Sequence, residues 1–162
     1  MMKAKSISLI LLPIFILIGC SNSQFTEIEN TVESLHGYIF IKDETLYFDK
    51  VEIITREDRD RIKELGLNEA RDYPSGYYIY NPTGDTDTFD LNEDTIYRFT
   101  DIQLLYVKET NGKRIYETTS REEFFNGSSY QNVSLEEQRI PYFIDIRDGK
   151  VVKITEEFIY TQ

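Results

Sequence analysis

The apolar run from Ile7 to Gly19 most constrains this chain, because it ends at Cys20, the only cysteine. The run follows Lys3 and Lys5, and it is well short of the ~20 apolar residues that a helix needs to cross a bilayer. A short apolar run after a basic start is typical of an export signal. No cysteine follows Cys20, so the exported part must fold without a disulfide and depend on packing alone.

The residues Leu17-Ile18-Gly19-Cys20 close this segment. They resemble the lipobox of bacterial lipoproteins, in which the cysteine thiol receives a diacylglycerol and becomes the first residue of the mature protein. The resemblance implies a signal peptide over residues 1–19, a lipidated tether over 20–31 and one globular β-rich domain over 32–162. It also implies a location on the extracytoplasmic face of the cell membrane, where two acyl chains hold a protein stably. The alternative is an uncleaved anchor with an incidental cysteine.

The charge of the chain limits its partners. The net charge is −11, and removal of residues 1–19 takes away Lys3 and Lys5 but no acid, which leaves −13. A body with this charge is repelled by anionic lipids and cell-wall polymers, so it should stand off the membrane on its lipid. Nucleic acid is not expected as a partner, because its binding needs a basic surface.

Short strand-like segments separated by turn residues indicate an α+β fold class that is mainly antiparallel β. We expect a small barrel or sandwich of about eight strands. One clear surface helix should begin at Thr55 as N-cap and end before Gly66, and Ser120-x-x-Glu123 should cap a second short helix. The predicted strands begin near Val32 and then cover Leu46–Ile54, Tyr77–Tyr80, Thr88–Leu91, Ile96–Phe99, Ile102–Lys108, Arg114–Thr118, Ile140–Ile146 and Val151–Tyr160.

Two hairpins can be located from their turn residues. Asn111-Gly112 is a strong hairpin signal between the sixth and seventh predicted strands. At the C-terminal hairpin, a three-residue loop over 147–149 would place Ile144 opposite Val152, whereas a two-residue loop would place it opposite Lys153. Because a one-residue slip moves every side chain to the wrong face, the apolar match favours the three-residue loop, with Gly149 at positive φ.

The sequence offers few residues for catalysis. His36 is the only histidine and lies next to Gly37 in a predicted strand, so a structural role is expected. No Gly-x-Ser-x-Gly element is present, and one histidine without a free thiol makes zinc unlikely to bind. Paired carboxylates of an envelope hydrolase remain an alternative, because their separation depends on the fold. We expect a protein that is not an enzyme and has no cofactor.

The segment 85–94 is rich in oxygen ligands, and Asp85, Asp87 and Asp90 are its candidate calcium ligands. Their spacing misses the EF-hand pattern, and the alternation of Thr88 and Asp90 with apolar residues favours a strand with a solvated face. A weak calcium or small-ligand site is therefore an alternative, and no metal site is expected here.

Tyrosine is the more informative residue class, with 12 in the chain. Tyr78 and Tyr80 lie in a segment with aromatic residues on both faces of the predicted strand, which suits contact with a sugar or a protein. The alternative is that these tyrosines fill and border the core. Together with the lipobox they indicate a non-catalytic interaction module that binds a protein or an envelope component.

Three further segments carry a second resemblance: Phe48–Glu52, the capped helix to Leu67, and Pro74–Asn81. They are similar to segments of uncharacterised small lipoproteins of Gram-positive bacteria. This resemblance extends over most of the mature chain, and it implies no activity and no site residues.

Overall fold

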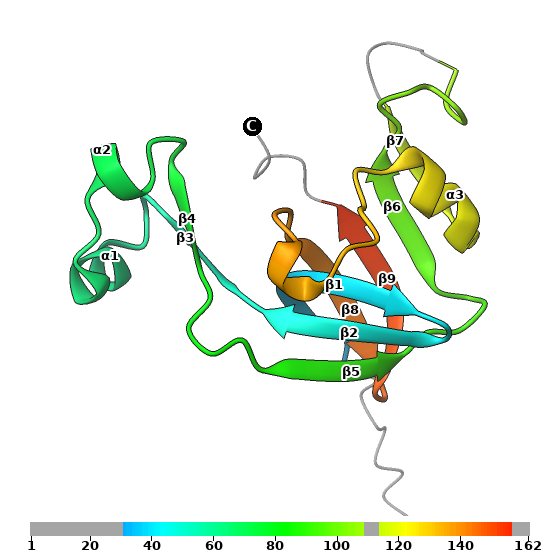
Figure 1. Ribbon diagram of the computed structural model, residues 1–162, viewed down its shortest axis with the longest axis horizontal. Helices are drawn as coiled ribbons and strands as arrows, with labels where there is room; N and C mark the ends of the chain where they lie inside the picture. Colours follow the sequence, from blue (N-terminus) through cyan, green and yellow to red (C-terminus); the bar gives the residue numbers. More distant parts are fainter. Residues whose placement is uncertain (1–30, 109–113, 157–162) are drawn as a thin grey trace, which may run out of the picture.

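The computed structural model describes residues 31–108 and 114–156 (Figure 1). Within them lie nine strands, three α-helices and one 3-10 helix. In chain order these are β1 (Glu33–Lys42), β2 (Thr45–Lys50), β3 (Glu52–Thr55), α1 (Arg59–Leu65), α2 (Glu69–Asp72), β4 (Tyr77–Tyr80), β5 (Thr86–Asp90), β6 (Ile96–Thr100), β7 (Ile115–Thr118), α3 (Arg121–Gly127), η1 (Leu135–Glu137), β8 (Tyr142–Arg147) and β9 (Lys150–Glu156).

Seven strands form one curled sheet in the order β5-β2-β1-β8-β9-β6-β7. Most neighbours are antiparallel, and β6 runs parallel to β9. The predicted α+β class with mainly antiparallel strands is confirmed. The sheet curls far enough for Asp90 of β5 to meet Lys150 of β9 in a single bridge, but it does not close into a barrel.

The core lies on the face of the sheet that α3 covers. Phe124 of α3 is fully buried, and its ring stacks on Tyr97 with the centroids 5.0 Å apart. Tyr142 and Phe99 meet the same ring edge-on. Ser120 caps α3 as predicted, since its hydroxyl accepts a hydrogen bond from the Glu123 N–H. The return half of the predicted capping box is absent, because the Glu123 carboxylate accepts from Thr118 and Tyr116 instead. Aromatic side chains thus supply much of the apolar burial that a chain without a disulfide needs.

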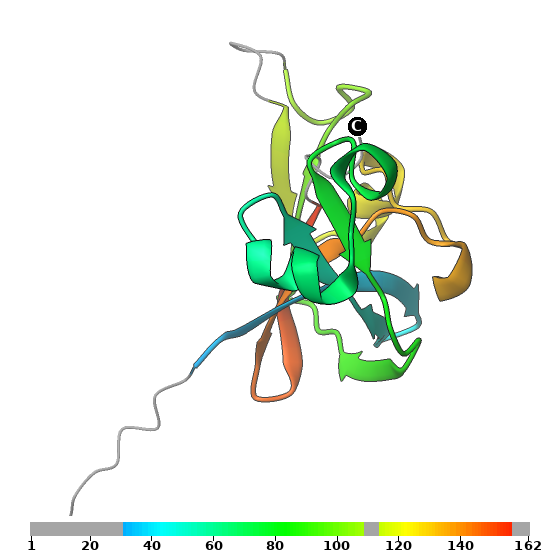
Figure 2. The same cartoon turned by 90° about the vertical axis from the view of Figure 1, so that its left-hand side faces the viewer.

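The strands β3 and β4 form a separate two-stranded sheet that carries α1 and α2 at its far end. We call residues 51–80 the arm, which lies to one side of the seven-stranded sheet (Figures 1 and 2). The predicted strand Leu46–Ile54 is therefore two strands, separated at Val51, and only the first belongs to the large sheet.

The predicted surface helix is present as α1. Gly66 adopts the left-handed conformation at its C-terminal end, as expected. The N-cap is Asp58 and not Thr55, because the chain makes a turn before the helix begins. The Asp58 carboxylate accepts hydrogen bonds from both the N–H and the hydroxyl of Thr55, which stabilises that turn.

The register predicted for the β8–β9 hairpin is wrong. Ile144 pairs with Ile154, and the loop is the two-residue turn Asp148-Gly149, with both residues at positive φ. A bulge beside Val152 shifts the register after the turn, so that Val151 and Ile154 both face the core. Apolar residues of β8 and β9 thus lie opposite each other because β9 contains an extra residue, and not because the loop is longer. The positive φ of Gly149 is confirmed.

The second predicted hairpin also differs. Strand β7 pairs with β6, and residues 102–108 form a loop in place of a strand. The buried carboxylate of Asp101 accepts the N–H groups of Leu105, Tyr106 and Val107 at 3.0, 2.7 and 2.9 Å, which organises this loop. Asn111-Gly112 lies outside the described residues.

Candidate functional site

The face of β1 and β2 away from the core carries an unusual set of side chains. Tyr38 pairs with Asp49 across the two strands, and Phe40 pairs with Tyr47. Directly opposed residues point to the same side, so all four lie on this outer face. Their neighbours along each strand point to the core and are between 0 and 5% exposed: Ile39, Ile41, Leu46 and Phe48.

Residues 130–138 form one wall beside this face. The Tyr130 hydroxyl accepts a hydrogen bond from the N–H of Ile41 at 3.0 Å, where β1 has passed the end of β8. The Gln138 amide donates to the carbonyl of Gln131 at 2.7 Å and holds the segment in a compact loop. Within it, a capping box between Ser134 and Glu137 stabilises η1.

Residues 81–84 form the opposite wall, between β4 and β5. Asn81 has a central role, because its amide donates to Asp49 Oδ2 at 2.8 Å while its carbonyl oxygen accepts the Gly84 N–H at 3.4 Å. The base of this wall is thus joined directly to the outer face of β2.

Two adjoining cavities of about 630 and 400 Å³ lie between these walls and share Asp49, Gly84, Leu135 and Glu136 as lining residues. We call them together the aromatic groove. The other residues that line it are Tyr38, Phe40, Lys42, Tyr47, Asn81, Pro82, Thr83, Thr86, Asn132, Val133, Ser134, Gln138 and Arg139.

Asp49 is the most unusual residue of the groove. It is only 7% exposed, and its Oδ1 atom is buried and accepts no hydrogen bond from any described residue. No Lys or Arg of the described residues forms an ion pair with it. A buried polar atom without a partner costs free energy, so it requires an explanation, and a functional role is one. Arg121 Nε and the Tyr142 hydroxyl are also buried without a partner, but neither lines this groove.

The aromatic rings form an apolar surface around this carboxylate. The rings of Phe40 and Tyr47 are tilted against each other with centroids 5.8 Å apart. Burial raises the pKa of the Tyr38 hydroxyl, Arg139 acts in the opposite direction, and Asp49 adds to the rise. Tyr38 therefore stays a neutral hydrogen-bonding phenol beside the acid at physiological pH.

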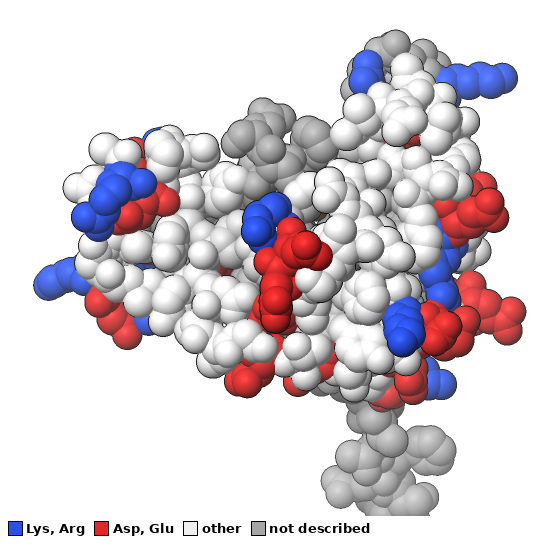
Figure 3. All heavy atoms as spheres, in the orientation of Figure 1, with Lys and Arg blue, Asp and Glu red and all other residues white. Residues whose placement is uncertain are grey.

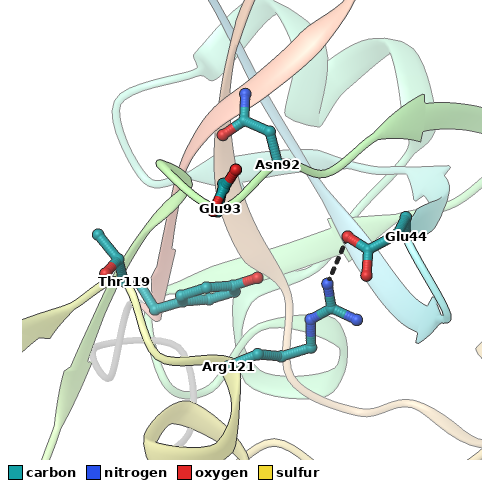
Figure 4. A pocket seen from close by; sticks show the side chains of 6 residues that line it. Glu44, Asn92, Glu93, Thr119 and Arg121 are labelled. Carbon is teal, nitrogen blue, oxygen red and sulfur yellow. Dashed lines mark hydrogen bonds and ion pairs between the residues drawn. The ribbon is translucent and has the colours of Figure 1, made fainter.

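A further cavity of about 500 Å³ lies at the start of α3 (Figure 4). Arg121 points from α3 toward the β1–β2 turn, where it pairs with Glu44 at 3.0 Å and donates to the Asp43 carbonyl. Burial raises the pKa of the adjacent Tyr97 hydroxyl, although Arg121 lowers it. Two nitrogens of the guanidinium are engaged by these groups, while Nε is buried without a hydrogen-bond partner among the described residues. We interpret this cluster as a contact that joins α3 to β1 and β2.

The residues singled out from the sequence do not gather at one place. Tyr78 and Tyr80 lie on β4 in the arm, half-buried, with the Arg61 guanidinium 5.1 Å from the centre of the Tyr80 ring. They do not share a sheet with Tyr97, because β4 and β6 belong to different sheets. His36 is half-buried on β1 with its ring 4.0 Å from that of Phe143, and burial lowers its pKa.

The candidate calcium ligands are exposed. Asp85 lies in the loop before β5, while Asp87 and Asp90 lie on that strand and point to opposite faces. Among residues 31–108 and 114–156, no group of three His, Cys, Asp or Glu side chains is arranged to hold a metal ion. Cys20 and the three residues before it, which resemble a lipobox, lie outside the described residues.

Sequence reasoning missed Asp49 as a site residue, because the local pattern indicates an exposed acid. In a strand with alternating faces, Asp49 follows the buried Phe48 and shares its own face with Tyr47. An acid beside a tyrosine on that face suggests a solvated position. Its burial comes from the loop 81–84 and from η1, which are distant in the sequence.

No protein-family model, curated protein or solved structure matches this chain. Within the described residues, every helix is too short or too polar to cross a membrane.

Proposed function

We propose that this protein is an extracytoplasmic lipoprotein, tethered to the cell membrane through Cys20, that acts as a non-catalytic binding module. The lipobox residues 17–20 after a short apolar run support the anchor. The described domain supports the binding role, because its outer sheet face is hollowed into the aromatic groove beside a buried acid.

The unsatisfied Oδ1 of Asp49 is the observation that carries the choice of site. Ligand sites are typically apolar or aromatic hollows with a few well-placed polar groups, and the groove has this composition. The β4 tyrosines that the sequence indicated lie elsewhere, and Tyr80 already contacts Arg61. We therefore place the binding role in the groove.

The anchor is tested by metabolic labelling with radioactive palmitate. The wild-type protein should carry the label, and Cys20→Ala should lose it completely and accumulate as precursor or be released. Ser23→Ala is the matched control, because it changes the tether and keeps the lipobox. Label on the Cys20→Ala protein would contradict the proposed anchor.

A further inference from the structure

The aromatic groove is lined by a carboxylate, that of Asp49, whose hydrogen-bonding capacity is only partly used. Asp49 has one carboxylate oxygen satisfied by the Asn81 amide and a second, buried oxygen that accepts nothing from the described residues. A carboxylate accepts hydrogen bonds and donates none when ionised, so a ligand group that pairs with the Asp49 carboxylate has to be a donor. A charged donor gains most there, because charge-assisted hydrogen bonds are the stronger ones.

The rings beside Asp49 favour a positive charge over a negative one. Phe40 and Tyr47 lie on the same sheet face as Asp49 and line the same cavity. The face of an aromatic ring attracts a cation through its quadrupole, and aromatic cages recognise ammonium groups in this way. Tyr38, which remains a neutral phenol, adds a third ring to this surface.

The basic residues of the groove leave Asp49 uncompensated. Arg139 donates to the carbonyls of Glu136 and Gln138, both at 2.8 Å, and is thereby directed to the backbone. Lys42 is exposed, so its repulsion of a second cation is screened by solvent. In the same groove, Glu136 adds a second acid.

The net negative charge of the whole molecule also favours a positively charged partner, and it acts at long range. The chain carries −11 overall, and in Figure 3 the basic side chains appear as separate spots, most of them with acids beside them. A negative field raises the association rate of a positively charged partner. A lone amine would leave most of a groove of this size unfilled, whereas a peptide segment presenting a basic side chain would occupy its length.

We propose that the aromatic groove binds a lysine or arginine side chain presented by a basic segment of a partner protein, with Asp49 as its counter-ion. The inference rests on the binding role proposed above and names the chemistry of its ligand. The partner's ammonium or guanidinium group pairs with the Asp49 carboxylate, which lines both cavities, and lies against the rings of Phe40 and Tyr47. Residues 81–84 and 132–136 flank the bound segment.

The test uses the full-length lipidated protein in detergent micelles and a fluorescent oligolysine peptide. Affinity is measured by anisotropy at physiological salt. Asp49→Asn should weaken binding about tenfold or more, since truncating one partner of a buried charge pair has effects of this order. Asp90→Asn is the matched control, because it removes the same charge from an exposed position on the neighbouring β5 and should leave affinity unchanged. An Nε-acetylated oligolysine should not bind.

Phe40→Leu keeps the test valid if Asp49→Asn fails to fold, which a thermal melt of each variant reveals. This variant retains an apolar side chain without the ring, and it should weaken peptide binding several-fold because the cation–π contact is lost. Unchanged affinity in a folded Phe40→Leu protein would overturn the proposal.

Three further outcomes would also overturn it. Equal losses in Asp49→Asn and Asp90→Asn would reduce the effect to bulk charge attraction. Binding of spermine without binding of the peptide would assign the groove to a small amine. Binding of neutral chito-oligosaccharides that depends on Asp49, without binding of oligolysine, would assign it to a glycan. In each case palmitate labelling at Cys20 is measured separately, so failure of the groove assignment is distinguishable from failure of the anchor.

Discussion

The seven-stranded sheet and the arm are stabilised in different ways. The sheet encloses a continuous cluster of buried side chains that includes Phe124, Tyr142 and Ile154, all at most 1% exposed. The arm carries two helices with no buried residue, and its buried apolar side chains are Val51, Ile54 and Tyr73. Apolar burial contributes about 25 cal/mol per Å², so the sheet supplies most of the stability of the molecule.

The arm depends more on surface charge pairs. Arg61 of α1 binds Glu52 of β3 at 2.8 Å and Glu64 at 2.7 Å, and Arg56 pairs with Glu69 at 2.7 Å. Exposed pairs of this kind contribute little, so the arm should open more readily than the sheet. One chain thus combines a sheet with a continuous buried core and an arm that is expected to open first, and the connection from the arm to β5 borders the aromatic groove.

Removal of a core ring should have the largest effect. Phe124→Ala deletes a fully buried side chain that contacts Tyr97, Phe99 and Tyr142, so the free energy of unfolding should fall by about 3–5 kcal/mol. Urea denaturation followed by circular dichroism measures it. Phe125→Ala, at the next and exposed position of α3, is the control and should have a much smaller effect. Similar losses at both positions would contradict the assignment of the core.

Asp101 stabilises the loop that follows β6, and its removal should have the second-largest effect on stability. Asp101→Ala leaves three loop N–H groups without their acceptor and should cost about 1–3 kcal/mol. Burial raises the pKa of Asp101, but the N–H groups of Val107, Tyr106, Leu105 and Leu104 outweigh it and hold the pKa below its usual value.

The lowered pKa of Asp101 gives this stabilisation a pH dependence. It should be present above pH ~4 and lost as the pH falls through the lower folded-state pKa, because the unfolded chain then binds the proton more readily. Unfolding measured between pH 7 and pH 2 should show a shallower acid limb in Asp101→Asn than in the wild type. Identical acid limbs would contradict this role.

A turn substitution should have an intermediate effect. Gly149→Val places a β-branched residue at φ 75° in the β8–β9 turn and should destabilise the protein by about 1 kcal/mol or more. Asp148→Gly is the control, since Asp148 has φ 52° and glycine adopts this region readily. A thermal melt of each variant measures the difference. A Gly149→Val protein as stable as the wild type would mean that the turn has another form.

The smallest effect is expected in the arm. Arg61→Met removes both ion pairs of α1, and amide hydrogen exchange in α1 should become a few-fold faster while the midpoint of global unfolding stays unchanged. Lys63→Met changes an exposed residue of the same helix and should alter neither quantity. A shift of the global midpoint by Arg61→Met would show that the arm unfolds together with the sheet.

Local sequence signals succeeded where one short segment determines the outcome. Gly66 and Ser120 mark helix ends in the structure as predicted, because the relevant hydrogen bonds span only a few residues. Asn111-Gly112 illustrates the limit of such signals. The strand expected before it is absent. The Asp101 carboxylate binds backbone N–H groups of residues 102–108 and holds them in a loop, and β7 pairs with β6 instead.

The sequence by itself determined the mainly antiparallel α+β class and the helix boundaries at Gly66 and Ser120, and it predicts an export signal that ends at Cys20. These features depend on composition, alternation and contacts between near neighbours. Only the tertiary structure decided that β3 and β4 leave the large sheet, that a bulge corrects the register of β9, and that Asp49 is buried. The physical reason is that each depends on which distant segments pack together. Asp49 is buried by residues 81–84 and 132–136, and the residues next to it in the sequence do not predict that these distant segments pack there.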